Sequence, residues 1–363
     1  MKEVTIRGQR VPSLMQGCMR ISNLSEAQVD ALLHFDLEHG INFFDHADIY
    51  GGEGVCETIF GNVLKKQPAL RDKMFIQSKC GIHRSETNHY DFSKDYIIEC
   101  VNKSLERLQC GYLDYLLLHR PDALMEPKEV ADAFDTLYSS GKVRHFGVSN
   151  HNPYQIELLK TALQQPLEIN QMQMSLLHTP MIDAGLNVNT FDSHGIERGA
   201  MTLDYCRLHA ITMQCWSPFL YGMFEGNYLD NPKFPEVNQR LQELADDYHT
   251  TKAGIAIAWL LRHPANMQVV LGSCNTSHIK DIIDASAVSY THLDVYKRQL
   301  CVSSLSISSI PSKYFISFAN RSYCLIQYCS KSSFTSTCNI FKAALLVMPK
   351  TTRNASNVKY LFT

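Results

Sequence analysis

Short apolar runs alternate with longer stretches of helical pattern along most of this chain. Enrichment of the short runs in β-branched and aromatic residues favours strands. The run Tyr115-Leu116-Leu117-Leu118 is apolar at every position, which is typical of a parallel strand buried on both faces. The predicted strands are residues 13–19, 42–45, 74–79, 114–119, 143–148, 167–172, 212–216 and 268–271.

The stretches between these strands carry the start and stop signals of helices. Ser25 with Gln28 forms a capping box, and Gly40 is placed to end that helix. Asn152 followed by Pro153 indicates a cap with proline at the first helical position. Successive strand-then-helix units of this kind predict a parallel α/β fold.

Eight such units predict more than a parallel sheet, because eight strands is the number that closes a (β/α)₈, or TIM, barrel. Residues 4–6 and 10–11 predict a short N-terminal β-hairpin ahead of the first barrel strand. We expect this hairpin to plug the base of the barrel.

Polar side chains mark the ends of several predicted strands, where the active sites of such barrels lie. Tyr50 lies five residues beyond the first of them, on the following loop. The strand-end residues are Asp45, Lys79, His119, and Ser149 with Asn150.

These groups fit the reduction of a carbonyl, which needs a hydride on carbon and a proton on oxygen. No side chain supplies a hydride, so a cofactor must. Tyrosine, with an ordinary pKa of about 10, is a weak acid at neutral pH, and we expect Lys79 to lower the pKa of Tyr50. Asp45 would balance the Lys79 charge, and His119 would orient the substrate oxygen.

A metal-assisted barrel hydrolase is the alternative from a different enzyme class. His46, Asp48 and His119 are residue types that bind metals. No further ligand cluster accompanies them, so we expect no metal. Loss of activity on chelation would favour this alternative over the reductase.

Composition limits the compartment and the partners. The 363 residues carry a net charge of −2, which favours neither a nucleic-acid nor a membrane partner. None of the twelve cysteines forms a C-x-x-C pair or a zinc pattern. With no signal peptide or membrane-length apolar run, we expect a cytoplasmic protein whose thiols are mostly small buried side chains.

Four segments, in order, resemble signatures of the aldo-keto reductase family. They are residues 45–52 (DHADIYGG), 78–81 (SKCG), 119–122 (HRPD) and 141–150 (GKVRHFGVSN). The resemblance covers about residues 6–285 and is strongest to the bacterial YdhF-like oxidoreductases of that family. It implies a (β/α)₈ barrel that reduces aldehydes or ketones with NAD(P)H. It also implies a catalytic tetrad of Asp45, Tyr50, Lys79 and His119, with Tyr50 as the general acid.

The resemblance also implies which residues hold the cofactor. Strong selection of NADPH in this family uses Lys and Arg around the adenosine 2′-phosphate. The matching positions are Gly272 and His278, so we expect NADPH with a modest preference and NADH also accepted. The implied contacts are Ser149, Asn150 and Gln171 for the nicotinamide carboxamide, Trp216 for its ring, Ser217, Phe219 and Gly222 for the pyrophosphate, and Ser273, Asn275 and His278 for the 2′-phosphate.

One alternative remains within the family, where some relatives are cofactor-binding regulatory subunits. Such a protein would bind NADPH without turnover, and the intact tetrad argues against it. Trp216 also has a simpler interpretation as an ordinary core residue. The reductase hypothesis predicts a small-molecule carbonyl substrate and makes no prediction of oligomeric state.

The composition changes near residue 287. From Leu300 onward there are seven Lys or Arg and no Asp, Glu or Gly. Together with the last two bases of an Ala287 codon, the codons of residues 288–299 can form a perfect DNA inverted repeat. It resembles two transposon mosaic ends joined head to head, a by-product of sequencing-library preparation. We therefore expect a C-terminally truncated barrel in 1–287, an adapter-derived segment in 288–299, and an unrelated, poorly ordered tail in 300–363. Amplification of source DNA across codons 286–300 tests this division.

Overall fold

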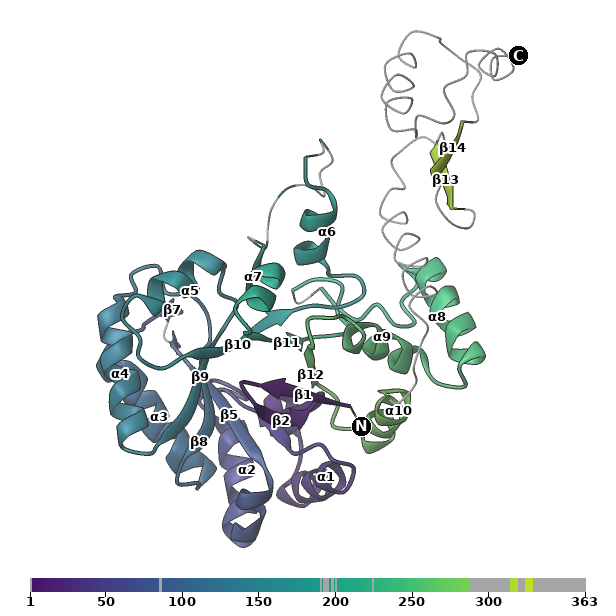
Figure 1. Cartoon of the computed structure of the whole chain (residues 1–363). Coiled ribbons are helices and arrows are strands. Elements are labelled where there is room, and N and C mark those ends of the chain that lie inside the picture. Colours follow the sequence, from purple (N-terminus) through teal and green to yellow (C-terminus); the bar gives the residue numbers. More distant parts are fainter. Residues whose placement is uncertain are drawn as a thin grey trace, which may run out of the picture. The chain divides into compact units, whose positions relative to one another are not determined.

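Eight parallel strands close into a barrel in the computed structural model (Figure 1). The structure describes residues 2–84, 87–189, 191, 196, 199, 201–223 and 225–286, and the backbone of 314–318 and 324–328. Around the barrel the strand order is β10-β11-β12-β3-β4-β5-β8-β9. The barrel strands are β3 (Leu14–Gly17), β4 (Phe43–Asp45), β5 (Phe75–Cys80), β8 (Leu113–Leu118), β9 (Val143–Ser149), β10 (Leu167–Gln173), β11 (Thr212–Trp216) and β12 (Gln268–Leu271).

All eight predicted strands are therefore confirmed, two of them with the predicted bounds (β11 and β12). The first predicted strand was too long, because Cys18 and Met19 belong to the 3₁₀ helix η1 (Cys18–Asn23). His119 lies one residue beyond β8, yet its N–H still donates to the Cys80 carbonyl at 2.8 Å. This backbone hydrogen bond to β5 keeps His119 at the mouth of the barrel, although the strand β8 has ended.

The predicted N-terminal hairpin is confirmed as β1 (Glu3–Ile6) and β2 (Gln9–Pro12), which pair antiparallel. Val4, Ile6 and Val11 are buried in one cluster with the inward-facing side chains Met15 and Phe43 of the barrel. This shared apolar cluster closes one end of the barrel and leaves the other end for the site.

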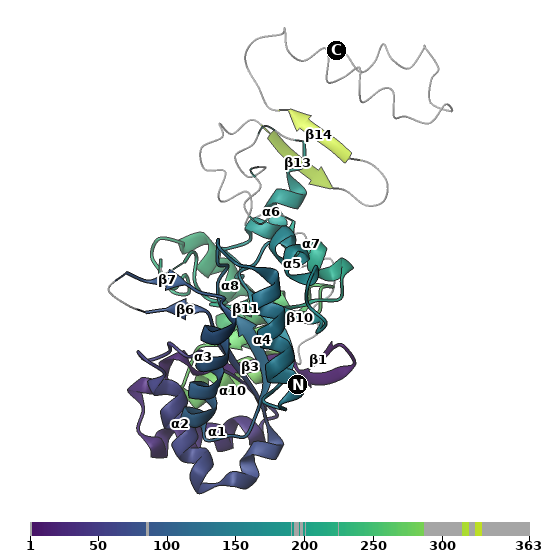
Figure 2. The ribbon, with the colours of Figure 1, turned by 90° about the vertical axis from the view of Figure 1, so that its left-hand side faces the viewer.

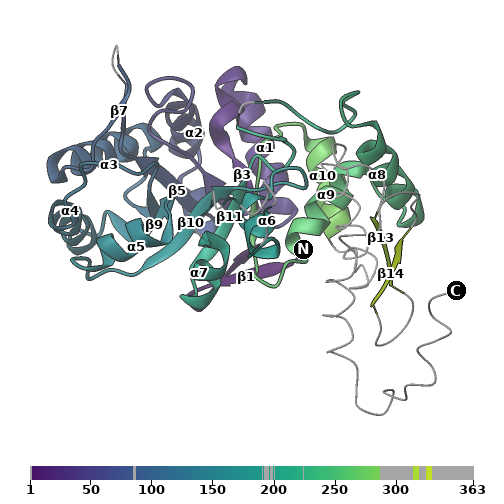
Figure 3. The same ribbon diagram turned by 90° about the horizontal axis from the view of Figure 1, so that it is seen from above.

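Helices cover the outside of the barrel (Figures 1 and 3). Ser25 and Gln28 form the predicted capping box of α1, and Asn152 and Gln155 form another at α5. Gly40, with φ of 84°, follows the end of α1 as predicted. The helices are α1 (Glu26–Glu38), α2 (Val55–Lys66), α3 (Lys94–Leu108), α4 (Pro127–Ser139), α5 (Pro153–Lys160), α6 (Pro180–Leu186), α7 (Thr202–Leu208), α8 (Pro235–Asp247), α9 (Lys252–Leu261) and α10 (Thr276–Ser286).

Two small elements were not predicted. The 3₁₀ helix η2 (Pro68–Lys73) precedes β5, and a hairpin of β6 (Ile82–His83) and β7 (His89–Tyr90) extends from the loop after β5 (Figure 2). Strands of two residues carry too few positions for an alternating pattern to appear in the sequence.

The chain divides into two units, Met1–Tyr296 and Lys297–Thr363. In the second unit, β13 (Tyr314–Phe318) and β14 (Cys324–Tyr328) pair antiparallel. The predicted adapter-derived segment 288–299 and the rest of the predicted tail lie outside the described residues. Within the described part of the chain, no helix is both long and apolar enough to cross a membrane.

Asp36 on α1 gives a pH-dependent prediction for this fold. Its side chain is buried, and neither carboxyl oxygen has a partner among the described residues. Burial raises the pKa of Asp36 from 3.8 to about 8. The unfolded chain therefore loses this proton first. The stability that the neutral carboxyl contributes is fully present below the pKa of the unfolded chain. It is lost as pH rises toward the higher pKa of the folded protein.

We expect Asp36→Asn to make the melting temperature less sensitive to pH between 5 and 8. Thermal unfolding of the variant and its parent at both pH values measures this difference. Asp95→Asn, at an exposed position, is the matched control and should leave the sensitivity unchanged. Equal sensitivity in the Asp36 variant and its parent would contradict the buried-acid interpretation.

Candidate active site

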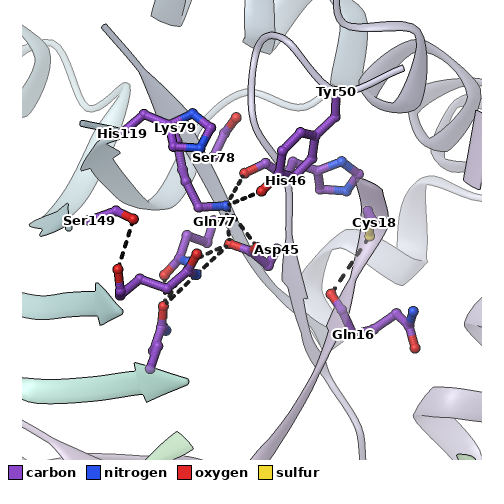
Figure 4. A network of polar contacts seen from close by, with 12 residues as sticks. Gln16, Cys18, Asp45, His46, Tyr50, Gln77, Ser78, Lys79, His119 and Ser149 are labelled. Atoms are coloured by element: carbon purple, nitrogen blue, oxygen red, sulfur yellow. Dashed lines mark hydrogen bonds and ion pairs between the residues drawn. The ribbon is translucent and has the colours of Figure 1, made fainter. Parts of the chain in front are cut away.

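Four side chains predicted to act together meet at the C-terminal ends of β4, β5 and β8 (Figure 4). Lys79 Nζ donates to Asp45 Oδ1 and Oδ2, both at 2.7 Å, and to the Tyr50 hydroxyl at 3.1 Å. The ring of His119 stands edge-on to Tyr50, with centroids 6.0 Å apart. Lys79 links the acid to the phenol in a single contact chain.

The two-residue period of the strands brings these groups inward. Side chains at every second position of a barrel strand face the interior. On β5 the inward series is Phe75, Gln77 and Lys79, and on β4 it is Phe43 followed by Asp45. Each row of inward side chains begins in the apolar cluster at the hairpin end of the barrel and ends in a charged group at the mouth. Lys79 and Asp45 are 1% and 2% exposed, so their charges are balanced away from water.

The pKa of Tyr50 differs from the sequence-based expectation. Burial raises it, the Lys79 charge lowers it by less, and the net pKa lies above 10.0. Lys79 therefore lowers the Tyr50 pKa as expected, but burial of the phenol outweighs this effect. The Asp45 carboxylate beside Lys79 also raises this pKa and offsets part of the ammonium charge. Tyr50 is thus a protonated phenol at neutral pH.

Lys79 is charged at neutral pH, whereas His119 is neutral. Burial disfavours the Lys79 ammonium ion, but Asp45 and Tyr50 outweigh that effect and raise its pKa. Burial, aided by Lys79, Arg120 and Arg84, holds the pKa of His119 well below 6.5. His119 is therefore a neutral imidazole, and its Nδ1 has no partner among the described residues.

His46 and Asp48, two of the three candidate ligands of the hydrolase alternative, lie on the loop between β4 and α2. His46 packs edge-on against Phe60 at 4.5 Å, and burial lowers its pKa to about 3. Burial raises the pKa of Asp48 to about 7. Across the residues that the structure describes, no three His, Cys, Asp or Glu side chains are grouped as metal ligands.

A partly buried ion pair joins α2, the helix after this loop, to α3. Glu57 on α2 accepts from Ser78 Oγ at 2.6 Å and from Arg107 Nε at 2.8 Å. Ser78 immediately precedes Lys79 on β5, so α2 and α3 are joined to the strand that carries the lysine. These residues were not identified from the sequence, since Glu57 and Arg107 read as ordinary helical charges.

The residues predicted for the nicotinamide carboxamide gather beside the tetrad. Ser149 Oγ donates to the backbone carbonyl of Gln171 at 2.8 Å, and the side-chain Nε2 of Gln171 donates to Asp45 Oδ1 at 3.0 Å. Asn150 has φ of 60°, and its Oδ1 accepts from Trp216 Nε1 at 3.2 Å. Trp216 is partly buried at the end of β11. Its hydrogen bond with Asn150 joins the residue predicted to stack on the nicotinamide ring to one predicted to contact the carboxamide.

The three residues predicted for the pyrophosphate lie on the loop after β11. Ser217 has φ of 52°, so the chain turns sharply as it leaves the strand. Phe219 packs against the core, and its carbonyl accepts from the Tyr228 N–H at 3.0 Å. Gly222 lies in a turn, where its carbonyl accepts from the Glu225 N–H at 3.3 Å.

The residues predicted for the 2′-phosphate lie between β12 and α10. Ser273 Oγ accepts from the Asn275 N–H at 3.1 Å, and Asn275 Oδ1 accepts from the His278 N–H at 3.4 Å. The His278 side chain is exposed in the first turn of α10. Lys280, two residues further along α10, pairs with Asp284 at 2.6 Å.

Sequence reasoning missed an arginine at this loop. Arg20 Nη1 donates to the Gly272 carbonyl at 3.3 Å. A Cβ on Gly272 would lie 3.8 Å from the same nitrogen, so Arg20 covers a position that has no side chain of its own. Arg20 and Gly272 are 252 residues apart, and only the β12–β3 pairing reveals their contact.

Sequence reasoning identified Gln171 as a cofactor contact but missed the layer of buried glutamines beneath Asp45 to which it belongs. The signal was present as amides at inward positions of otherwise apolar strands. These residues, here called the glutamine layer, are Gln77, Gln171, Gln214 and Gln268 on β5, β10, β11 and β12.

Comparison with known proteins agrees with this geometry. Residues 13–298 match the model of the aldo/keto reductase family. Oxidoreductase YdhF of Escherichia coli is 35% identical over 276 residues, which cover 74% of this chain and 85% of YdhF. A 6-dehydroglucose reductase of Agrobacterium fabrum is 36% identical over 287 residues, which cover 76% of this chain and 89% of that enzyme.

The fold is shared with solved structures at lower identity. An aldo/keto reductase from Klebsiella pneumoniae, solved in complex with NADP and acetate, has a TM-score of 0.63 at 20% identity. The similarity covers 81% of this chain and 93% of the Klebsiella protein. The family match spans the whole barrel, and both relatives exceed 30% identity over most of their length. This chain is therefore an oxidoreductase that belongs to the aldo/keto reductase family.

Proposed function

We propose that this protein reduces the carbonyl of a small aldehyde or ketone to an alcohol, with NADPH as hydride donor and Tyr50 as general acid. The observation that carries this proposal is the contact of Lys79 Nζ with both the Asp45 carboxylate and the Tyr50 hydroxyl. Such a chain holds a protonated phenol beside a buried cation at the mouth of the barrel.

The donor set fits a nicotinamide group. A carboxamide carries both a donor and an acceptor. The Ser149 hydroxyl, the Asn150 amide and the Gln171 amide oxygen offer partners for both, while the Gln171 N–H groups stay on Asp45 and Gln214. Left-handed backbone at Asn150 and Ser217 is uncommon for non-glycine residues and is concentrated at ligand sites. When bound, the cofactor supplies a hydride to the carbonyl carbon.

The side chains then handle the oxygen. The neutral His119 imidazole donates a hydrogen bond that orients the carbonyl oxygen. As negative charge develops on that oxygen, the Tyr50 O–H gives up its proton to it. Lys79 stabilises the phenolate left behind, and Asp45 keeps the ammonium ion in place. An alkoxide is a stronger base than a phenolate, so the raised pKa of Tyr50 still permits the transfer.

Three observations support the proposed cofactor, reaction and cellular setting. The Klebsiella relative was solved with NADP, and the A. fabrum relative is named a reductase. The eight described cysteines are free thiols, six of them buried, which supports a reducing cytoplasm.

The direct test is NADPH oxidation followed at steady state over a panel of aldehydes and ketones. We expect turnover that needs both the carbonyl and the cofactor and that survives chelation. NADPH binding without turnover on any carbonyl would instead favour the regulatory-subunit alternative.

Cofactor preference gives a prediction at His278. Its exposed imidazole lies at the predicted 2′-phosphate position and can donate a hydrogen bond to a phosphate oxygen. We expect His278→Ala to lower the ratio of NADPH to NADH affinity. Fluorescence titration of both cofactors measures the ratio. An unchanged ratio in the variant would contradict the role of His278.

A further inference from the structure

The glutamine layer forms a continuous set of hydrogen bonds across the barrel interior. Gln268 Nε2 donates to the Pro12 carbonyl at 2.8 Å, and Gln214 Nε2 donates to Gln268 Oε1 at 2.9 Å. Gln77 Nε2 and Gln171 Nε2 donate to Gln214 Oε1 at 2.9 and 3.0 Å. The set thus begins at the hairpin β1–β2 and reaches strands on the opposite wall.

The layer ends on the tetrad. Gln77 Nε2 donates to Asp45 Oδ1 at 2.6 Å (Figure 4). Gln171 Nε2 donates to the same oxygen at 3.0 Å. Asp45 Oδ1 therefore accepts two amide N–H groups in addition to Lys79. The four glutamines are at most 2% exposed, so water does not replace these partners readily.

The direction of each amide follows from the far end of the layer. A backbone carbonyl only accepts hydrogen bonds, so Gln268 must present its N–H to Pro12. Its oxygen then faces Gln214, whose own oxygen faces Gln77 and Gln171. Those two side chains are left with N–H groups directed at Asp45. Reversing any amide would bring two like dipole ends together in a buried site.

We propose that Gln77 is a positioning residue for the reaction: its amide, oriented through Gln214 and Gln268 by the Pro12 carbonyl, holds the Asp45 carboxylate in the orientation that keeps Lys79 against Tyr50. Gln77 touches neither of the reacting groups. It acts by fixing one rotamer of Asp45 and by sharing the charge that Asp45 places beside Lys79. This inference rests on the proposed function, because it assigns a role within the same tetrad.

Gln77→Met removes the N–H donor to Asp45 at nearly constant volume, together with the two hydrogen bonds that Gln77 exchanges with Gln214. We expect kcat to fall about tenfold at both pH 5.5 and pH 8, the order of effect of one lost hydrogen bond to a charged group. NADPH binding, measured by Trp fluorescence, should stay within twofold of the parent. Unchanged kcat would overturn the proposal, as would an equal loss of NADPH binding.

Gln77→Glu provides a readout that a merely structural residue would not move. At pH 5.5 the introduced carboxyl can carry a proton and donate it to Asp45, whereas at pH 8 two carboxylates would face each other. We expect the kcat of this variant, relative to the parent, to be several-fold higher at pH 5.5 than at pH 8. Concentrations are normalised to NADPH binding sites, so that only folded enzyme is compared.

Gln268→Met and Gln268→Glu are the matched comparisons, because they alter the far end of the same layer and reach Asp45 only through Gln214 and Gln77. Their kcat should also fall, because the contact that orients the amides is lost, but by a factor that changes little with pH, and their melting temperatures should fall. Equal pH effects at positions 77 and 268 would overturn the proposal, and so would a pH-independent Gln77→Glu. If Gln77→Glu does not fold, the Gln77→Met result decides. Failure of the proposed function is separate, since the parent would then bind NADPH without reducing any carbonyl.

Discussion

Replacing Tyr50 with phenylalanine is expected to lower kcat by roughly 10²–10⁴-fold, the usual effect of losing a general acid. The variant loses the hydroxyl that lies 3.1 Å from Lys79 Nζ but keeps the ring. Lys79 Nζ, 4.9 Å from the ring centroid, and the edge-on contact with His119 both remain possible with phenylalanine. The loss therefore isolates the proton donor from the shape of the site.

Two measurements separate chemistry from binding in this variant. Single-turnover reduction at saturating NADPH gives the chemical rate, and Trp fluorescence quenching gives cofactor affinity, which should be retained. Tyr115→Phe is the matched control. The buried hydroxyl of Tyr115 has no partner among the described residues, and the residue lies in the apolar cluster formed with the N-terminal hairpin. A Tyr50→Phe enzyme as fast as its parent would remove Tyr50 from the mechanism.

Lys79→Met is expected to cost both activity and folding stability. The substitution leaves the buried Asp45 carboxylate without its cation, and breaking one side of a buried ion pair costs about 3–5 kcal/mol. The two amide donors from the glutamine layer offset only part of that charge. Carbonyl reduction should also fall to near background, because nothing then stabilises the Tyr50 phenolate. Urea unfolding and steady-state kinetics measure the two losses.

The double variant Asp45→Asn/Lys79→Met separates charge from packing. With neither charge present, the unfolding free energy should recover most of the loss seen in Lys79→Met, while activity stays lost. Lys128→Met is a matched control at the exposed Lys128–Asp132 pair, where the expected cost is about 0.2–1 kcal/mol. A double variant no more stable than Lys79→Met would show that packing of the lysine chain, not its charge, dominates.

The barrel and much of the candidate site could be predicted because their signals are local. β11 and β12 begin and end where the apolar β-pattern does, so their predicted bounds match the structure. Asp45 and Lys79 stand out because each is a charge at the end of an apolar strand. Capping residues such as Ser25 and Asn152 act within one helical turn, and so they too were readable from the sequence.

Errors arose where the environment outweighed local chemistry. The pKa of Tyr50 was expected to fall beside Lys79, but burial of the phenol and the nearby Asp45 charge reverse the net direction. Cys18 and Met19 continue an apolar pattern, yet the chain turns into η1 there. Burial and chain direction at the mouth depend on the closed barrel, which no short window of sequence contains.

The sequence by itself determined the eight strand-then-helix units, the polar groups at the strand ends and the family signatures that order them. Only the tertiary structure decided that the Pro12 carbonyl faces Gln268, that Gln77 donates to Asp45, and that Arg20 covers Gly272. Gln268 and Pro12 are 256 residues apart, and Gln77 and Gln214 are 137 apart. Such pairs meet because closing the barrel joins the first strand to the last and brings inward side chains of distant strands to one level. The hydrogen bonds that orient the tetrad are therefore a property of the closed barrel.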